Sequence, residues 1–266
     1  MRKTPLVEAS YRELLEFVRF YRHHGTPVII GGWAVYFYNP YYGSVDIDVV
    51  GHSFQGAFED IIERYERTHG YEFEALPGAV ETTARKPILS KGKLMGQMEI
   101  DACSYERPKA SGFHEDESLE LPYSAIEDRG CKEEVRLARD SMFYVPCKEL
   151  LMLYKVKARR DRAFDIRTKG LEMGGERLQW LRGKVVKDGS DILALLDPNA
   201  KGAQLPGSVS YPKLRRLAGK HGMDEVVAET VKEVVEDDQA WQSYGRRFKT
   251  SGMRKAFSGT QHQTPE

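Results

Sequence analysis

A glycine pair between two apolar segments is the feature that most constrains how this chain folds. Residues 28–30 form a short apolar run, Gly31 and Gly32 follow it, and residues 33–38 are mostly apolar or aromatic until an Asn-Pro pair ends the pattern. Because glycine allows tight turns and a close approach of the backbone, this pattern predicts a strand, a glycine turn and a short helix. Backbone N–H groups at such a helix start bind anions, so Gly31 and Gly32 are candidate phosphate ligands.

An acidic pair follows the glycine turn. Residues 45–50 alternate apolar and acidic side chains, and this period of two predicts a strand with Asp46 and Asp48 on one face. Two like charges side by side are costly unless a cation neutralises them. Ligands that are all oxygen atoms favour Mg²⁺ or Mn²⁺ over zinc, so Asp46 and Asp48 are candidate metal ligands. A solvated edge strand is the alternative interpretation of the acidic pair taken alone.

The glycine pair and the acidic pair form one compound pattern: Ile30-Gly31-Gly32, then thirteen residues, then Asp46-Ile47-Asp48. This pattern resembles the DNA polymerase beta-type nucleotidyltransferase superfamily. Its minimal and abortive-infection toxin-like members are the most similar, and they usually carry an arginine where this chain has Tyr42. The resemblance implies an enzyme that moves NMP from an NTP to a hydroxyl acceptor. Asp46 and Asp48 would then bridge two Mg²⁺ or Mn²⁺ ions, and the glycine turn would hold the β and γ phosphates.

A third carboxylate on a neighbouring strand is part of such sites, where it completes one metal site and assists deprotonation of the acceptor. Residues 94–105 alternate apolar and polar side chains, which predicts a strand. Asp101 follows an apolar residue and is the candidate for the third carboxylate, while Glu99 on the same predicted strand face is the alternative. Ser44, just before the acidic pair, is a candidate ligand of phosphate or of metal-bound water.

The C-terminal part bears a looser resemblance to the same toxin-like enzymes, in a Lys/Arg-rich segment and a later Lys-Asp-x-x-Asp segment. Lys155 or Lys157 could reach triphosphate oxygens, and a solvated helix face is an equally good interpretation of both. Asp188 and Asp191 are expected to pair with the arginines of the preceding helix and hold that helix in place.

The predicted elements divide the chain into an α/β part and a helical part. Helical periodicity covers four ranges, 8–24, 54–69, 148–196 and 211–241. We therefore predict a mixed α/β (α+β) fold, in which a catalytic domain with a small mixed sheet spans residues 1–145. A helical domain spans residues 146–245, with the active site between the two domains. Residues 246–266 are predicted to be a basic, flexible tail.

Local charge bears on the acceptor. The chain carries 40 Lys and Arg against 40 Asp and Glu, so its net charge does not attract nucleic acid. Residues 155–169 nevertheless hold seven basic residues against two acids, and residues 239–265 hold five basic residues and no acid. This local excess favours an RNA end such as tRNA as the acceptor, with a protein hydroxyl or a small molecule still open.

Two other classes of protein are compatible with the same features. One is a nucleotide-binding module that keeps the fold and turns nothing over, and the other is a helical interaction protein with an incidental acidic pair. A toxin-like enzyme would have an antitoxin protein as a further partner.

Cysteine usage and apolar patterning indicate the compartment. The three cysteines lie far apart and none forms a CxxC pair, so the sequence supports neither a disulfide framework nor a zinc site. The N-terminus lacks the apolar core of a signal peptide, and no apolar run is long enough to span a membrane. We expect a cytoplasmic protein that makes no membrane contact.

Overall fold

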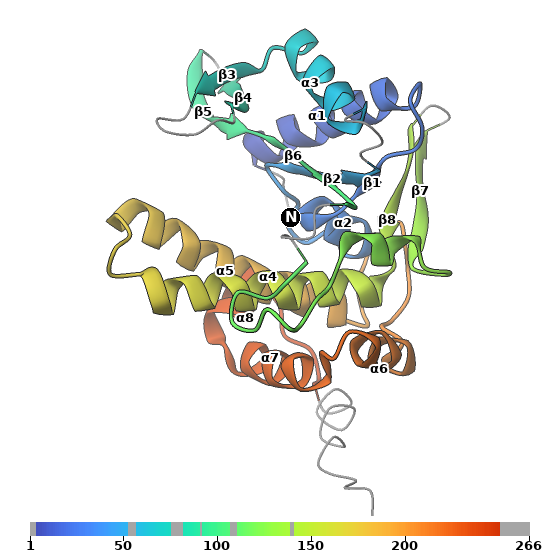
Figure 1. Cartoon of the computed structure of the whole chain (residues 1–266), viewed down its shortest axis with the longest axis vertical. Coiled ribbons are helices and arrows are strands. Elements are labelled where there is room, and N and C mark those ends of the chain that lie inside the picture. Colours follow the sequence, from blue (N-terminus) through green and yellow to red (C-terminus); the bar gives the residue numbers. More distant parts are fainter. Residues whose placement is uncertain are drawn as a thin grey trace, which may run out of the picture. The chain divides into compact units, whose positions relative to one another are not determined.

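The computed structural model describes residues 4–52, 57–75, 82–90, 92–106, 111–138 and 141–250. The chain divides into two compact units (Figure 1). Unit 1 comprises Met1–Pro108, Tyr123–Cys147 and Gly202–Leu205, and unit 2 comprises Lys109–Pro122, Lys148–Lys201 and Pro206–Glu266. Two short segments, Lys109–Pro122 and Gly202–Leu205, therefore belong to a different unit from the residues on either side of them in the sequence.

A five-stranded mixed sheet forms the centre of unit 1, with the strand order β6-β2-β1-β8-β7. The five strands are β1 (Val28–Ile29), β2 (Ile47–Gly51), β6 (Ile100–Ser104), β7 (Lys132–Ala138) and β8 (Ser141–Pro146). Strand β1 is antiparallel to β2 and parallel to β8, β2 is parallel to β6, and β7 is antiparallel to β8. This sheet, together with the helices, confirms the predicted mixed α/β fold class.

The helices of unit 1 are α1 (Pro5–Tyr21), α2 (Gly31–Tyr38) and α3 (Ala57–Thr68). Helix α1 starts earlier than predicted because Thr4 caps it: the Thr4 hydroxyl accepts a hydrogen bond from the backbone N–H of Val7. Helix α2 is short and strongly buried, and its Trp33 indole donates a hydrogen bond to the Ser10 hydroxyl of α1 at 3.1 Å. This contact ties the glycine-turn helix to α1.

A three-stranded antiparallel sheet also belongs to unit 1, formed by β3 (Glu72–Ala75), β4 (Thr82–Ser90) and β5 (Lys93–Met98). The single strand predicted over residues 94–105 is wrong, because the chain changes sheets at Glu99. Strand β5 pairs with β4, whereas β6 pairs with β2. Met98 and Ile100 are both buried, so the alternation continues across the break and conceals it.

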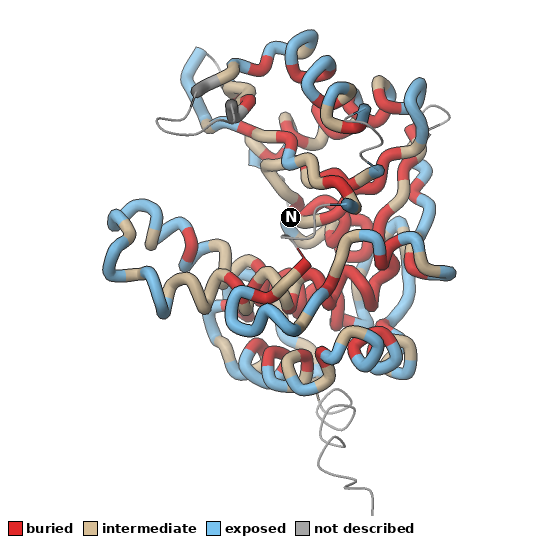
Figure 2. Tube along the Cα trace, viewed as in Figure 1, coloured by how far each residue is buried: buried red, intermediate tan, exposed pale blue. Residues whose placement is uncertain are grey.

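Unit 2 is helical: α4 (Lys148–Lys169), α5 (Gly175–Leu196), α6 (Tyr211–Lys220), α7 (Asp224–Glu236) and α8 (Asp238–Tyr244). The helical pattern predicted over residues 148–196 is two helices joined by a turn at residues 170–174. Residues 188–196 of α5 are buried, while most of its first turns are exposed (Figure 2). No helix in the described ranges combines the length and apolar character that crossing a membrane requires.

One buried acid of α3 makes stability depend on pH. Burial and the nearby Glu63 raise the pKa of Glu66 from 4.5 to about 7, although Arg67 acts in the opposite direction. Between these two values the folded chain keeps a proton that the unfolded chain releases, so stability falls as pH rises through this interval.

We expect Glu66→Gln to raise the free energy of unfolding by about 1–3 kcal/mol above pH 7, because glutamine cannot ionise. Below pH 4.5 the substitution should have little effect, since Glu66 is then protonated in both states. Urea denaturation on both sides of the interval measures the difference. Equal effects at both pH values would contradict the raised pKa.

Candidate functional site

The glycine turn lies directly against the second acid of the acidic pair. Gly31 begins α2 with φ +67°, in the left-handed region that favours glycine. A Cβ atom at Gly31 would stand 1.8 Å from Oδ2 of Asp48, so no larger residue fits without moving that carboxylate. The Ile30 N–H donates to the Asp48 carbonyl at 2.9 Å, which ties the turn to β2. The structure therefore brings together two features that the sequence separates.

Ser44 completes the contact around the turn. A Cβ atom at Gly32 would lie 2.8 Å from Oγ of Ser44 and 2.9 Å from its Cβ. The absence of a side chain at both glycines thus leaves the backbone at the start of α2 next to a hydroxyl and a carboxylate. Gly31, Gly32 and Ser44 thus lie together with Asp48 at the start of α2, and phosphate binding there stays a prediction.

The third acid lies on the neighbouring strand at the same level as the second. Strands β2 and β6 are parallel, and Asp48 is the register partner of Asp101. Neighbouring strands are about 4.8 Å apart, and paired residues of parallel strands point to the same face of the sheet. Asp46 stands one residue before the start of β2. Asp46 and Asp48 are partly buried and Asp101 is exposed.

Glu99, the alternative third acid, has a different partner. Its carboxylate accepts a hydrogen bond from the Arg85 guanidinium of β4 at 2.5 Å, in an ion pair that is about two-thirds buried. Glu99 also lies at the break between β5 and β6, where its carbonyl accepts from the Ile47 N–H at 3.0 Å. Its role in the structure is to fasten the two sheets, and this favours Asp101 as the third carboxylate.

A cluster of polar residues beside Asp46 was not singled out from the sequence. The buried Glu13 carboxylate accepts from the Lys86 ammonium at 2.6 Å and from the Tyr65 hydroxyl at 2.9 Å. Burial and the charge of Glu13 are the main causes that raise the pKa of the Tyr71 hydroxyl, and Asp46 adds to the rise. Asp46 is therefore within electrostatic reach of this cluster. The residues lie on separate elements, so no local sequence signal could have found them.

The two lysines predicted to contact phosphate belong to unit 2. The Lys155 ammonium lies 2.8 Å from Asp191 and 3.6 Å from Asp188, and Lys157 lies 2.5 Å from Asp161. Burial tends to raise the pKa of the Asp191 carboxyl, but the ammonium groups of Lys155 and Lys187 outweigh burial and hold the pKa below its usual range. Asp188 pairs with Arg162 as expected, whereas the partners of Asp191 are lysines and not the expected arginines. A phosphate contact for either lysine stays a prediction.

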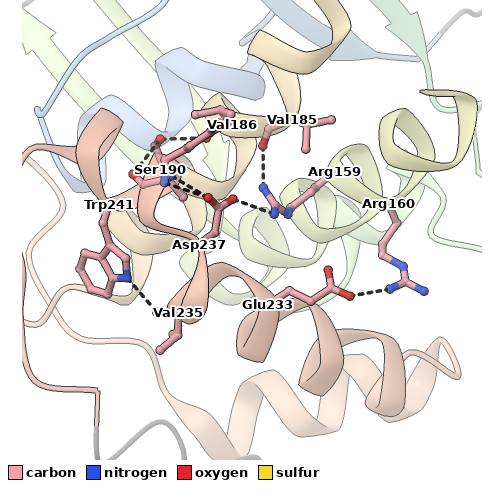
Figure 3. Close-up of polar contacts among 11 residues, drawn as sticks. Arg159, Arg160, Val185, Val186, Ser190, Glu233, Val235, Asp237 and Trp241 are labelled. Carbon is pink, nitrogen blue, oxygen red and sulfur yellow. Dashed lines mark hydrogen bonds and ion pairs between the residues drawn. The ribbon is translucent and has the colours of Figure 1, made fainter. Parts of the chain in front are cut away.

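The basic segment of α4 is matched by acids from several elements. All seven basic side chains have a carboxylate partner: Lys155 with Asp191, Lys157 with Asp161, Arg159 with Asp237, Arg160 with Glu115, Arg162 with Asp188, Arg167 with Glu115, and Lys169 with Asp165. Figure 3 shows Arg159 between the Val185 carbonyl and Asp237, and Arg160 directed toward Glu233. The charge excess in the sequence of this segment is therefore compensated in the fold.

The described start of the predicted tail is also ion-paired. Arg246 lies 2.8 Å from the buried Asp197, and Arg247 lies 2.5 Å from Asp238. The basic residues Arg254 and Lys255 lie outside the described residues. Of the tail cations in the described residues, Arg246 and Arg247 thus have carboxylate partners, whereas no ion pair involves the exposed Lys249.

The predicted metal ion needs several oxygen ligands, and the acidic pair is one source of them. In the part of the chain that the structure describes, no group of three or more His, Cys, Asp or Glu side chains is arranged to hold a metal ion. Mg²⁺ is usually bound through one or two carboxylates together with substrate phosphates and water. Asp48 and Asp101, in register beside the backbone at the start of α2, fit this mode of binding.

Comparison with known proteins gives likenesses among solved structures alone. No protein-family model matches the chain, and no curated protein matches it significantly. The crystal structure of an antigenic nucleotidyltransferase-like protein from Paracoccidioides brasiliensis is similar, with a TM-score of 0.43 and 14% sequence identity over 82% of this chain and 93% of that chain.

Proposed function

We propose that the chain is a nucleotidyltransferase that moves NMP from an NTP to a hydroxyl acceptor and releases pyrophosphate. The observation that carries this proposal is the contact of the Gly31 backbone with the Asp48 carboxylate, with Asp101 in register on the next strand. A phosphate-binding turn and an acid pair at one place suit a reaction at a phosphorus atom.

The first task of the site is to bind the triphosphate. The N-terminus of α2 offers backbone N–H groups and the positive end of the helix dipole to phosphate oxygens. The glycines place no side chain of their own over this backbone, and the Ser44 hydroxyl beside Gly32 can donate a further hydrogen bond. Preorganised donors of this kind stabilise charge that develops during transfer, because they need no rearrangement when the reaction occurs.

The carboxylates have the second task. Asp46, Asp48 and Asp101 would hold Mg²⁺ or Mn²⁺, which when bound polarises phosphoryl oxygens and neutralises their charge. Asp101 is exposed, and in the proposed reaction it accepts the proton of the acceptor hydroxyl. Asp48 is held in place by its contact with Gly31.

We expect Gly32→Val to weaken NTP binding by about 10- to 100-fold, the loss of one or two hydrogen bonds to charged phosphate. The valine would meet Ser44 and cover the backbone at the start of α2. Calorimetric titration with each NTP measures the affinity, and the melting temperature reports folding. Gly183→Val is the matched control, because Gly183 is also helical and has nothing within 4 Å of its Cβ position.

Unchanged NTP affinity in a folded Gly32→Val chain would reduce the glycine pair to a simple turn. Loss of folding would leave affinity unmeasured, and Gly32→Ala then provides the smaller substitution at the same position. Its single methyl group still falls within 3 Å of Ser44, so it should weaken binding in the same direction.

Incubation with NTPs labelled at the α-phosphate, together with total cell extract, tests the reaction itself. The proposal expects an extract component to acquire the label and unlabelled pyrophosphate to be released. Binding of NTP without any transfer would instead favour a regulatory nucleotide-binding module of the same fold. A toxin role controlled by an antitoxin protein stays a prediction from the resemblance.

A further inference from the structure

We propose that the exposed face of the first turns of α5, formed by Arg177, Trp180 and Lys184, binds single-stranded RNA. This inference deepens the proposed function by naming the acceptor class, and it rests on that proposal only for the acceptor role. The binding surface lies within unit 2. It differs from the α4 segment and the tail, whose local charge predicts RNA binding.

Trp180 is exposed where the two other tryptophans are buried. Its exposed fraction is 54%, against 0% for Trp33 and 5% for Trp241. The indole of Trp180 is thus presented to solvent, where a partner can reach it. Every nucleobase has a π-face, so an exposed indole is a stacking platform for bases of any sequence.

Basic side chains stand on both sides of the indole. Residues 177, 180 and 184 follow helical spacing and share one face over about 10 Å of helix. The Lys184 ammonium lies 5.1 Å from the centre of the Trp180 ring. An RNA strand presents a phosphate on each side of every base. A cation on each side of the indole can therefore contact these phosphates while the base stacks on the ring.

The charge of this face differs from that of α4. Residues 175–187 contain four basic residues and one acid, Glu176. In the described ranges no carboxylate forms an ion pair with Arg177 or Arg182, whereas every basic residue of the α4 segment has such a partner. Lys187 is paired with Asp191 and Arg182 lies on another side of α5, so Arg177 and Lys184 supply the positive charge of this face.

The neighbours of the indole favour RNA over a protein partner. A protein hot spot needs surrounding contacts that exclude water from the buried side chain. The residues next to Trp180 on α5 include the exposed Glu176, Gln179 and Gly183, and these three supply no apolar contact. Stacking and phosphate contacts need no such rim, because bases stack on an open platform.

Tryptophan fluorescence of the full-length chain, titrated with a single-stranded RNA oligonucleotide of mixed sequence and without NTP, tests the proposal. Stacking of a base on Trp180 should quench the emission. The other two tryptophans are buried, so the change reports on Trp180. The fluorescence change should vanish in Trp180→Phe. Binding of labelled RNA by Trp180→Ala, measured by anisotropy, should be about 5- to 100-fold weaker.

Two arginine variants distinguish RNA binding at this surface from nonspecific attraction of RNA by positive charge. Arg177→Gln should weaken binding and lower the salt slope in a log-log plot by about 0.7. Arg182→Gln removes the same charge from an exposed position on another side of α5, and it should weaken binding much less. Melting temperatures of the variants should stay close to that of the unmodified chain, because these side chains are exposed.

Equal weakening by Arg177→Gln and Arg182→Gln would overturn the proposal, as would RNA binding that Trp180→Ala leaves unchanged. Failure to bind RNA would also overturn it, while label transfer to a protein or a small molecule would leave the proposed reaction intact. Conversely, RNA binding at Trp180 without any transfer would support this surface and count against the proposed enzyme.

Discussion

Asp48→Asn is expected to abolish NMP transfer and leave the fold intact. Asparagine matches the size of aspartate, so it fits against Gly31, but it loses the charge that would hold a divalent cation. Because metal ions supply several kcal/mol of charge stabilisation, we expect a rate lower by about 1,000-fold or more. Transfer of labelled NMP measures the rate, and thermal unfolding measures the fold.

Asp46→Asn should behave in the same way, since both acids are proposed to hold the metal. Each substitution also removes a negative charge from a crowded acidic site, so the melting temperature should stay equal or rise slightly. Asp60→Asn is the matched control, because Asp60 is an exposed acid of α3 in the same unit. Full activity in Asp48→Asn, or unfolding of both site variants, would contradict the proposed active site.

The second large effect is expected at Asp101. Asp101→Asn should lower the transfer rate by about 100-fold or more, because it removes both a proposed metal ligand and the group that accepts the acceptor proton. Glu99→Gln should change the rate much less, since Glu99 is engaged with Arg85 at 2.5 Å. Parallel rate measurements on the two variants give the ranking.

Stability should follow the opposite order. Glu99→Gln weakens a partly buried ion pair and should lower the melting temperature, whereas Asp101 is exposed and its amide variant should unfold like the unmodified chain. A larger loss of activity in Glu99→Gln than in Asp101→Asn would show that the carboxylate before the break in the strand, and not the one after it, serves the reaction.

Local signals predicted the elements around the site. The apolar run, the glycine pair and the Asn-Pro stop correspond to β1 and α2, and the alternation after them corresponds to β2. Each of these signals acts within a few residues, through backbone freedom at Gly31 or through side-chain period. The sequence did not predict the hairpin of β7 and β8. This hairpin contributes the strand next to β1, where Tyr144 of β8 is the register partner of Val28.

The basic segment of α4 shows the limit of counting charges along a chain. Arg159 pairs with Asp237, 78 residues away, and Arg160 pairs with Glu115, 45 residues away. Counting charges within a stretch of sequence detects these cations but not their partners, which lie in a loop and at the junction of α7 and α8. The exposure of the Trp180 side chain was likewise not predictable from the sequence, because an apolar residue in a helical pattern is expected to face the core.

The sequence by itself determined the mixed α/β fold class, the glycine turn and the presence of candidate acids, because these depend on side-chain type and short-range spacing. Only the tertiary structure decided that Gly31 touches Asp48 and that Asp101 stands in register with it. It also decided which cations are neutralised. Strand register and ion pairing are set by contacts between residues far apart in the chain, and such contacts leave no periodic signal in the sequence.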